Sequence, residues 1–351
     1  MRITYKPLTM KITPMSSCKP VRPLVSFEPG GLHRGINMEH FFRRKDKVVF
    51  VIGATGTGKS RLAIDLASRF PAEVVNSDKM QVYRGLEIAT NKVTEEECRG
   101  IPHHLLGIVD PNSNFTSEDF CHQASVAIDS IVRRDRLPII AGGSNSFIYA
   151  LNDYAEFRMK YEPRFLWVDV SLEILHSFVS ERVDKMVEAG LLDEVKRMFD
   201  PEADYSVGIR RAIGVPEMDE FLRAEAMGAS ERTKAKLLRS AIAKIKENTC
   251  LLARRQLQKI HRLNSRWDWN MHRLDASEAF LKRGNDRQAD EAWDNLVAGP
   301  ATMIVDSFLY NDGLATINVP SETTTTTATV LAAAAASAQV PMAAAVAAAS
   351  R

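Results

Sequence analysis

The sequence predicts an α/β fold, in which a parallel sheet is flanked by helices and the carboxyl-terminal half is rich in helix. Short runs of apolar, mostly β-branched or aromatic residues occupy residues 47–53, 72–78, 137–143 and 165–171, and helical patterns separate them. Near-continuous apolar strands followed by helices are typical of a parallel sheet that is covered on both faces. A glycine-rich segment directly after the first run, and two long helical patterns later in the chain, support the same fold class.

The segment after the first run, "GATGTGKS" at residues 53–60, matches the G-x-x-x-x-G-K-[ST] pattern between a strand and a helix. Its glycines let backbone N–H groups point at phosphate oxygens, and the positive end of the next helix adds to the attraction. Lys59 supplies a mobile charge for the distal phosphate, and the Ser60 hydroxyl suits Mg2+. The sequence therefore predicts a P-loop-type sheet with a phosphate-chain site formed by Gly53, Ala54, Thr55, Gly56, Thr57, Gly58, Lys59 and Ser60.

Polar or small residues follow two further strands of the predicted sheet. The second run ends in Asn76-Ser77-Asp78, and the third ends in Gly142-Gly143-Ser144. Ligands of parallel α/β sheets bind beyond the carboxyl ends of the strands. We therefore expect both segments to face the same crevice as the phosphate loop.

The helix-rich half begins near Ser171. Apolar residues recur at helical spacing over residues 171–199 and again over residues 231–263, where the other face of the predicted helix is strongly basic. Gly190 is expected to break the first of these patterns.

Composition divides the chain into a basic leader at residues 1–45, a core domain at 46–300 and a Thr- then Ala-rich tail at 301–351. The leader is rich in Arg, Lys, Ser and Thr and has few acids, which is typical of an organellar transit peptide. A plastid address is expected; a mitochondrial or cytoplasmic location, or a leader with no address, are the alternatives. The tail is expected to be disordered rather than membrane-spanning, because Ala is barely apolar on insertion scales.

The whole chain is close to neutral, with 46 Lys and Arg against 44 Asp and Glu. Composition alone therefore neither requires nor excludes nucleic acid as a partner. The four cysteines lie far apart and form no C-x-x-C pair, which argues against a disulfide framework and against a zinc finger. No membrane partner is indicated, and a monomer is the default oligomeric state.

A phosphate loop by itself favours a nucleotide hydrolase or a small-molecule kinase. Two features point elsewhere. The third run leads into Gly-Gly-Ser where a hydrolase usually places a metal-orienting Asp, and Asp169 is the one other Asp that follows an apolar run. In addition, residues 79–92, "KMQVYRGLEIATNK", are rich in side chains that can hydrogen-bond to a base or stack on it. A P-loop small-molecule kinase remains an alternative.

Six separated blocks resemble the isopentenyltransferase superfamily in type and order. They are "GATGTGKS", "NSDKMQVYRGLEIATNK", "IPHHLLGIVDP", "FTSEDF", "IIAGGSN" and "ERVDKMVEAGLLDEV", within a resemblance that covers about residues 46–297. Further segments, including "GIRRAIGVPE", "NTCLLARRQLQKI" and "DEAW", are similar to the plant adenylate isopentenyltransferases, which carry out the first step of cytokinin biosynthesis. The family prenylates the exocyclic amine of adenine, either in tRNA or in free nucleotides.

The resemblance implies that the phosphate loop holds the diphosphate of dimethylallyl diphosphate rather than a nucleotide to be hydrolysed. Mg2+, held by Ser60 and substrate phosphates, would be the cofactor. Asp78 takes the position of the family's catalytic aspartate, which accepts the proton of the adenine amine; its other reading is a turn residue. Thr90 matches a hydroxyl position near that amine, and Ser144 a hydroxyl position near the donor diphosphate.

Several other polar residues have two readings each. Arg182 either clamps the diphosphate or lies on a solvated helix face. Lys92, Arg210 and Arg211 are possible contacts for acceptor phosphates. The pair His103-His104 is expected to be structural rather than a metal site, because it has no carboxylate partner at metal-ligand spacing within a helical turn.

The acceptor is expected to be a free adenine nucleotide, ADP or ATP more than AMP, and no stable nucleic-acid partner is expected. The tRNA-modifying branch, which remains an alternative, inserts a helical subdomain where this chain has only residues 151–163, and it has Gly-Tyr-Arg-Gln where residues 214–217 read "GVPE". The carboxyl-terminal zinc finger of its eukaryotic members also has no counterpart in the Cys and His pattern.

Overall fold

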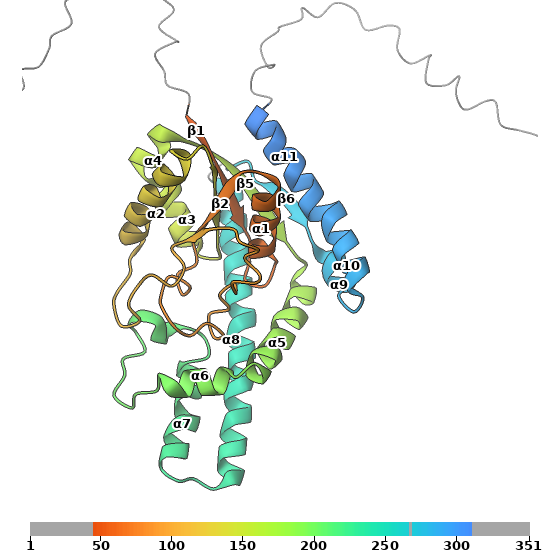
Figure 1. Cartoon of the computed structure of the whole chain (residues 1–351). Coiled ribbons are helices and arrows are strands. Elements are labelled where there is room, and N and C mark those ends of the chain that lie inside the picture. The colour runs from red at the N-terminus through yellow and green to blue at the C-terminus, as the bar shows by residue number, and fades with distance from the viewer. Residues whose placement is uncertain (1–44, 267–268, 311–351) are drawn as a thin grey trace, which may run out of the picture. The chain divides into compact units, whose positions relative to one another are not determined.

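The computed structural model describes residues 45–266 and 269–310. They contain a six-stranded parallel sheet in the order β3-β2-β4-β1-β5-β6, with helices packed on it (Figure 1). The predicted fold class is thus confirmed. The predicted leader, apart from Lys45, lies outside the described residues.

The four predicted strands are β1 (Asp46–Ile52), β2 (Ala72–Asn76), β4 (Leu137–Ala141) and β5 (Tyr161–Asp169). Their buried apolar residues make them readable from sequence. Two edge strands, β3 (His103–His104) and β6 (His272–Asp275), were not predicted. Both are short and polar, so neither carries the apolar run by which a strand is detected.

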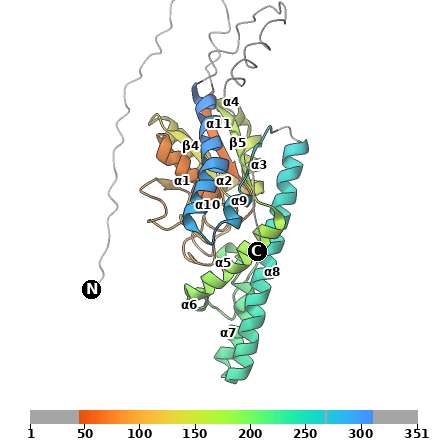
Figure 2. The same cartoon turned by 90° about the vertical axis from the view of Figure 1, so that its right-hand side faces the viewer.

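The two faces of the sheet bury alternate residues. Val49 and Val51 of β1 pack in one hydrophobic cluster, and Phe50 and Ile52 pack in the other. The first cluster is covered by α1 (Lys59–Arg69), α9 (Ser277–Leu281), α10 (Asp286–Trp293), the π-helical turn η4 (Asp294–Ala298) and α11 (Gly299–Tyr310) (Figure 2). The second is covered by α2 (Ser117–Val132), α3 (Asn145–Asp153) and α4 (Ala155–Lys160).

The second half of the described chain is largely helical, as predicted. It contains α5 (Leu172–Glu188), α6 (Leu191–Arg197), the short 3-10 turns η2 (Gly208–Arg211) and η3 (Pro216–Met218), α7 (Asp219–Ala226) and the 36-residue helix α8 (Glu231–Arg266). Gly190 separates α5 from α6 with a φ of 100°, which confirms the predicted break. Helix α8 packs against α3, which covers the sheet, and against α5 and α7 of the helical second half. It therefore links these two parts of the structure (Figure 1).

The structure continues across the predicted boundary at residue 300. Helix α11 continues to Tyr310 and buries Val305 and Phe308 against the sheet. Composition placed the boundary too early because residues 301–310 adjoin the Thr- and Ala-rich segment, whereas their apolar spacing belongs to the core. The remainder of the predicted tail, 311–351, lies outside the described residues.

No helix among residues 45–266 and 269–310 combines the length and the apolar character needed to cross a membrane.

Candidate active site

The loop after β1 has the geometry of a phosphate cradle. Gly56 and Gly58 adopt φ values of 84° and 90°, in the left-handed region that glycine favours. Gly53 lies so close to β5 that a Cβ there would sit 2.5 Å from the carbonyl oxygen of Val168. Helix α1 then starts at Lys59 without a side-chain cap. Its first N–H groups therefore remain available to an anion at the positive end of the helix.

The ammonium group of Lys59 lies in this cradle and donates to the carbonyl oxygen of Ala54 at 2.6 Å. Burial lowers the pKa of Lys59 to about 8; nearby Asp78 opposes the decrease and nearby Arg182 adds to it. Asp78 and Arg182 therefore lie within electrostatic range of the P-loop lysine.

The three predicted strand ends meet at one cavity of about 1230 Å³, which confirms the expected crevice. The phosphate loop, Asp78 and the Gly142-Gly143-Ser144 turn all line it. Their proximity follows from strand order, because β4 lies between β2 and β1. Helices α5, α8, α9 and α10 provide the other walls, with side chains such as Phe178, Leu252 and Phe280.

Asp78 is held by its own loop. Its Oδ1 accepts the N–H of Met80 at 2.9 Å, and its backbone N–H donates to the side chain of Asn76 at 3.1 Å. Ser144 begins α3, and its Oγ accepts the N–H of Lys79 at 2.7 Å. These bonds join the end of β2 to the end of β4. The turn reading of Asp78 is therefore correct for one carboxylate oxygen, while the residue as a whole still lines the cavity.

Thr90 and Arg182 also line the cavity. The Thr90 hydroxyl donates to the carbonyl oxygen of Leu86 at 2.7 Å and accepts from the Lys92 ammonium at 3.0 Å, which leaves one lone pair that can accept from a ligand. Arg182 donates to Thr55 Oγ1 at 3.0 Å, and its Nε is buried without a partner. Of the two readings of Arg182, the solvated helix face is wrong, and the position over the phosphate loop is the one observed.

Of the three residues suggested as contacts for acceptor phosphates, one lines the cavity and two do not. Arg211 lines the cavity, where it donates to the Tyr83 hydroxyl at 3.2 Å. Lys92 does not line it; its ammonium donates to the carbonyl oxygen of Gly85 at 2.6 Å and is buried inside its own loop. Arg210 is also absent from the cavity wall and donates to Asn112 instead.

Lys79 is a cavity residue that sequence reasoning missed. Burial and the neighbouring Arg211 guanidinium lower its pKa. Among the described residues, neither Lys79 nor Arg211 forms an ion pair with a carboxylate. Two adjacent cations without a counter-ion favour an anionic ligand on this wall. The sequence feature that could have identified Lys79 as a cavity residue is its position directly after Asp78.

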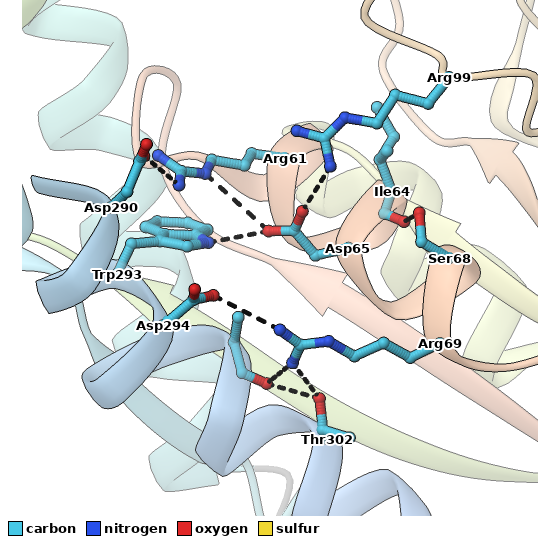
Figure 3. A network of polar contacts seen from close by, with 11 residues as sticks. Arg61, Ile64, Asp65, Ser68, Arg69, Arg99, Asp290, Trp293, Asp294 and Thr302 are labelled. Atoms are coloured by element: carbon cyan, nitrogen blue, oxygen red, sulfur yellow. Dashed lines mark hydrogen bonds and ion pairs between the residues drawn. The ribbon is translucent and has the colours of Figure 1, made fainter. Parts of the chain in front are cut away.

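Gln256 and Trp293 were missed as well, because they come from helices far from the phosphate loop in sequence. Gln256 of α8 hydrogen-bonds to the loop at Thr55. The ring of Trp293 lies against Gly58, where a Cβ would sit 2.6 Å from the ring, and its Nε1 donates to Asp65 at 2.9 Å (Figure 3). Arg61 stacks over the same ring at 4.6 Å and reaches Asp290 of α10 at 2.7 Å (Figure 3).

His103 and His104 lie at the sheet edge in β3, where His104 Nε2 is 2.6 Å from a carboxylate oxygen of buried Glu73. Arg134 also donates to Glu73, at 2.7 Å. These contacts give the pair a structural role. No cluster of three or more His, Cys, Asp or Glu suited to a metal occurs within residues 45–266 and 269–310.

Known proteins resemble this chain in sequence and in fold. The family model "IPP transferase" matches residues 81–164 and 151–262. The chain is 68% identical over 276 residues to adenylate isopentenyltransferase 5, chloroplastic, of Arabidopsis thaliana, a match that covers 78% of this chain and 83% of that protein. It is 54% identical over 301 residues to adenylate isopentenyltransferase 7, mitochondrial, of the same plant, covering 85% and 90%.

Solved structures give a more distant match. A eukaryotic dimethylallyltransferase acting on tRNA is similar with a TM-score of 0.64 and 26% identity, over 76% of this chain and 80% of that one. A tRNA isopentenylpyrophosphate transferase from Bacillus halodurans is similar with a TM-score of 0.56 and 26% identity, over 71% and 98%.

Proposed function

Because the chain belongs to the IPP transferase family of prenyltransferases, we propose that it transfers a dimethylallyl group from dimethylallyl diphosphate to the N6 amine of adenine in a free nucleotide. The observation that carries this proposal is a carboxylate, Asp78, that lines the same cavity as the phosphate cradle and lies within electrostatic range of Lys59 and Arg182. Such a pairing of a base with a diphosphate site suits displacement of diphosphate by a weak nitrogen nucleophile.

The donor half of the site consists of the loop at residues 53–60 with Arg182. Lys59 and Arg182 place two cations where negative charge grows as the carbon–oxygen bond of the diphosphate ester breaks. The N–H groups at the start of α1 recognise a phosphate chain whatever is attached to it. The loop can therefore hold an isoprenoid diphosphate as well as a nucleotide.

The acceptor half consists of Asp78 and Thr90. The exocyclic amine of adenine shares its lone pair with the ring, so it is a poor nucleophile. A carboxylate that accepts its N–H aims the lone pair at the allylic carbon and takes the proton as the new bond forms. Thr90 lines the same cavity and offers an oxygen acceptor.

Mg2+ is proposed as the cofactor. The Ser60 hydroxyl lies at the start of α1 on the cavity wall and can ligate such an ion together with the phosphate oxygens of the substrate. The donor set fits Mg2+ because this ion usually takes few protein ligands and keeps substrate phosphates and water. When bound, it would neutralise charge on the departing diphosphate.

A free nucleotide is favoured over tRNA as the acceptor. The matches to plant adenylate isopentenyltransferases are at 54–68% identity, whereas the structures of tRNA-modifying enzymes match at 26%. The basic residues of the cavity wall, Lys79 and Arg211, supply charge for the phosphates of ADP or ATP. The match to the IPP transferase family favours prenyl transfer over the phosphoryl transfer of a small-molecule kinase.

The test offers AMP, ADP, ATP and an unmodified tRNA anticodon stem separately with dimethylallyl diphosphate and Mg2+, and analyses the products by mass. We expect ADP and ATP to gain one five-carbon unit with release of diphosphate and with their own phosphates intact. Cleavage of ATP in the absence of the isoprenoid, without any prenylated product, would contradict the proposal.

The basic leader is proposed to direct the protein to an organelle, and the plastid is the specific proposal. The similar Arabidopsis proteins are named chloroplastic and mitochondrial, which supports an organellar location in general. Fusing residues 1–45 to a fluorescent protein in plant cells tests this, with plastid import as the expected result. Import into mitochondria, or a diffuse cytoplasmic signal, would overturn the plastid proposal.

A further inference from the structure

The side-chain amide of Gln256 bridges two loops that both line the cavity. Its Oε1 accepts the backbone N–H of Thr55 in the phosphate loop at 2.7 Å. Its Nε2 donates to the carbonyl oxygen of Gly143, in the turn after β4, at 2.8 Å. The orientation of this amide is unambiguous, because an N–H can only donate and a carbonyl oxygen can only accept.

The bridge is itself held in place. The backbone carbonyl oxygen of Gln256 accepts from the side chain of Asn145, which is 4% exposed, at 3.1 Å. Gly143 leaves room for the amide, since a Cβ there would lie 2.8 Å from Nε2 and 3.2 Å from Asp78 Oδ2. The turn, the amide and the carboxylate are therefore in close contact.

Each end of the bridge connects to one half of the reaction. On the donor side, the Thr55 hydroxyl also accepts from Arg182, so a hydrogen bond joins the arginine to the loop. On the acceptor side, the turn is joined to the loop of Asp78 because Ser144 accepts from Lys79. Gly142 packs on the backbone of Ser77, where a Cβ would lie 2.3 Å from the carbonyl carbon.

We propose that Gln256 is a positioning residue that fixes the distance between the donor cradle and the Asp78 carboxylate. This inference rests on the proposed function, because only a reaction between two bound substrates needs this distance to be constant. A nucleophile about 1 Å out of line costs on the order of 100-fold in rate even when both substrates still bind. Gln256 thus acts through Thr55 and Gly143 rather than by contact with the reacting atoms.

The deciding variant is Gln256→Met, which keeps the length of the side chain and removes both hydrogen bonds. We expect kcat to fall about 10- to 100-fold. The KM values for donor and nucleotide should stay within about threefold of wild type, since the groups that bind the phosphates are untouched. Gln258→Met is the matched control: it makes the same exchange two residues further along α8, at an exposed position, and should behave as wild type.

A second readout separates misalignment from a general loss of structure. When the amine is out of line, water competes for the allylic carbon: the carbon–oxygen bond to diphosphate breaks, a water oxygen bonds to carbon, and its proton is released. The ratio of five-carbon alcohol to prenylated nucleotide should therefore rise in Gln256→Met. Gln256→Leu removes the same two hydrogen bonds without adding charge, so it should lower kcat and raise the alcohol ratio in the same way.

Several results would overturn the inference. A wild-type kcat and product ratio in Gln256→Met would do so, as would a large rise in donor KM at unchanged kcat, which would make Gln256 a binding residue. If Gln256→Met does not fold, Gln256→Leu decides by the same two criteria. Failure of the proposed function is distinguishable, because then wild type and Gln258→Met would also form no prenylated nucleotide.

Discussion

Asp78 both closes a turn and lines the cavity. Its Oδ1 closes the turn after β2 by accepting from Met80, while the residue lines the cavity near Lys59 and Arg182. Its position at a strand end predicted that it faces the crevice, because parallel strands deliver their carboxyl-terminal residues to one edge, whereas its expected role as a base came from the resemblance to the family. The neighbours of Asp78 were less predictable, since Arg182, which lies within electrostatic range of it, comes from α5.

Replacing Asp78 with Asn should remove the base and keep the turn, because the amide oxygen can still accept from Met80. We expect kcat to fall by about 10²- to 10⁴-fold. The donor KM should not rise, since a negative charge near the diphosphate has been removed. Steady-state kinetics with the exposed Asp193→Asn as control provide the measurement. Undiminished activity in Asp78→Asn, and also in Asp78→Ala, would exclude Asp78 from the mechanism.

The pKa of Lys59, lowered by burial to about 8, predicts that kcat/KM for the donor depends on pH. The protonated amine binds the diphosphate, so kcat/KM for the donor should fall above pH 8, by about tenfold per pH unit once most of the lysine is neutral. Bound diphosphate raises this pKa, so kcat at saturating donor should stay level over the same range. Lys59→Arg keeps its charge over this pH range, so its kcat/KM for the donor should not fall above pH 8. A level kcat/KM to pH 10 in wild type would contradict the assignment.

The lysines of the loop at residues 79–92 show what could not be predicted from the sequence at the scale of single residues. Lys92 was a candidate contact for acceptor phosphates, but its ammonium donates to the Gly85 carbonyl within its own loop, and Lys79 lines the cavity instead. Spacing in an irregular loop does not reveal which side chain points outward. Strands and helices have fixed periods, whereas the loop at residues 79–92 has none.

At the scale of elements, detection followed the strength of the apolar pattern. The four central strands and α8 have long periodic signals, and all were predicted. Strands β3 and β6 are defined by pairing with β2 and β5 and not by their own residues. Helix α10 carries little apolar surface beyond Ala292 and Trp293, yet it supports the phosphate loop.

Trp293 should therefore contribute to both stability and donor binding. Its side chain is 2% exposed, packs on Gly58 and donates to Asp65 (Figure 3). We expect Trp293→Ala to lower the free energy of unfolding by about 4 kcal/mol. Trp293→Phe keeps a ring against Gly58 and loses the hydrogen bond, so about 1 to 2 kcal/mol is expected.

Urea denaturation provides this measurement, and the donor KM is measured alongside it. The KM should rise more in Trp293→Ala than in Trp293→Phe, because only the former removes the surface on which the loop rests. Leu296→Ala, at a 38% exposed position in the following turn, is the control and should change the free energy of unfolding far less. Equal stability of the three variants would show that α10 does not support the loop.

At the scale of the whole described chain, the site is assembled from segments that are distant in sequence. The phosphate loop, the turn at residues 142–144, and side chains of α5, α8 and α10 meet at one cavity. Local patterns predicted the strand ends and their common edge. Which helices would close the cavity depended on long-range packing, for which the sequence holds no local signal, so Gln256 and Trp293 were not foreseen.

Helix α11 supplies the last prediction, because it completes the core from beyond the predicted boundary. Val305 and Phe308 are at most 2% exposed. Lys47 of β1 donates to the carbonyl oxygen of Phe308, and Arg69 of α1 donates to Thr302 at 2.6 Å. A chain that ends at residue 300 should have an unfolding free energy about 4 kcal/mol lower than a chain that ends at residue 310, from the loss of the two apolar side chains alone. Denaturation of the two truncated proteins compares these outcomes directly. Equal stability of the two would place the boundary back at 300, since the helix would then contribute nothing to the core that it covers.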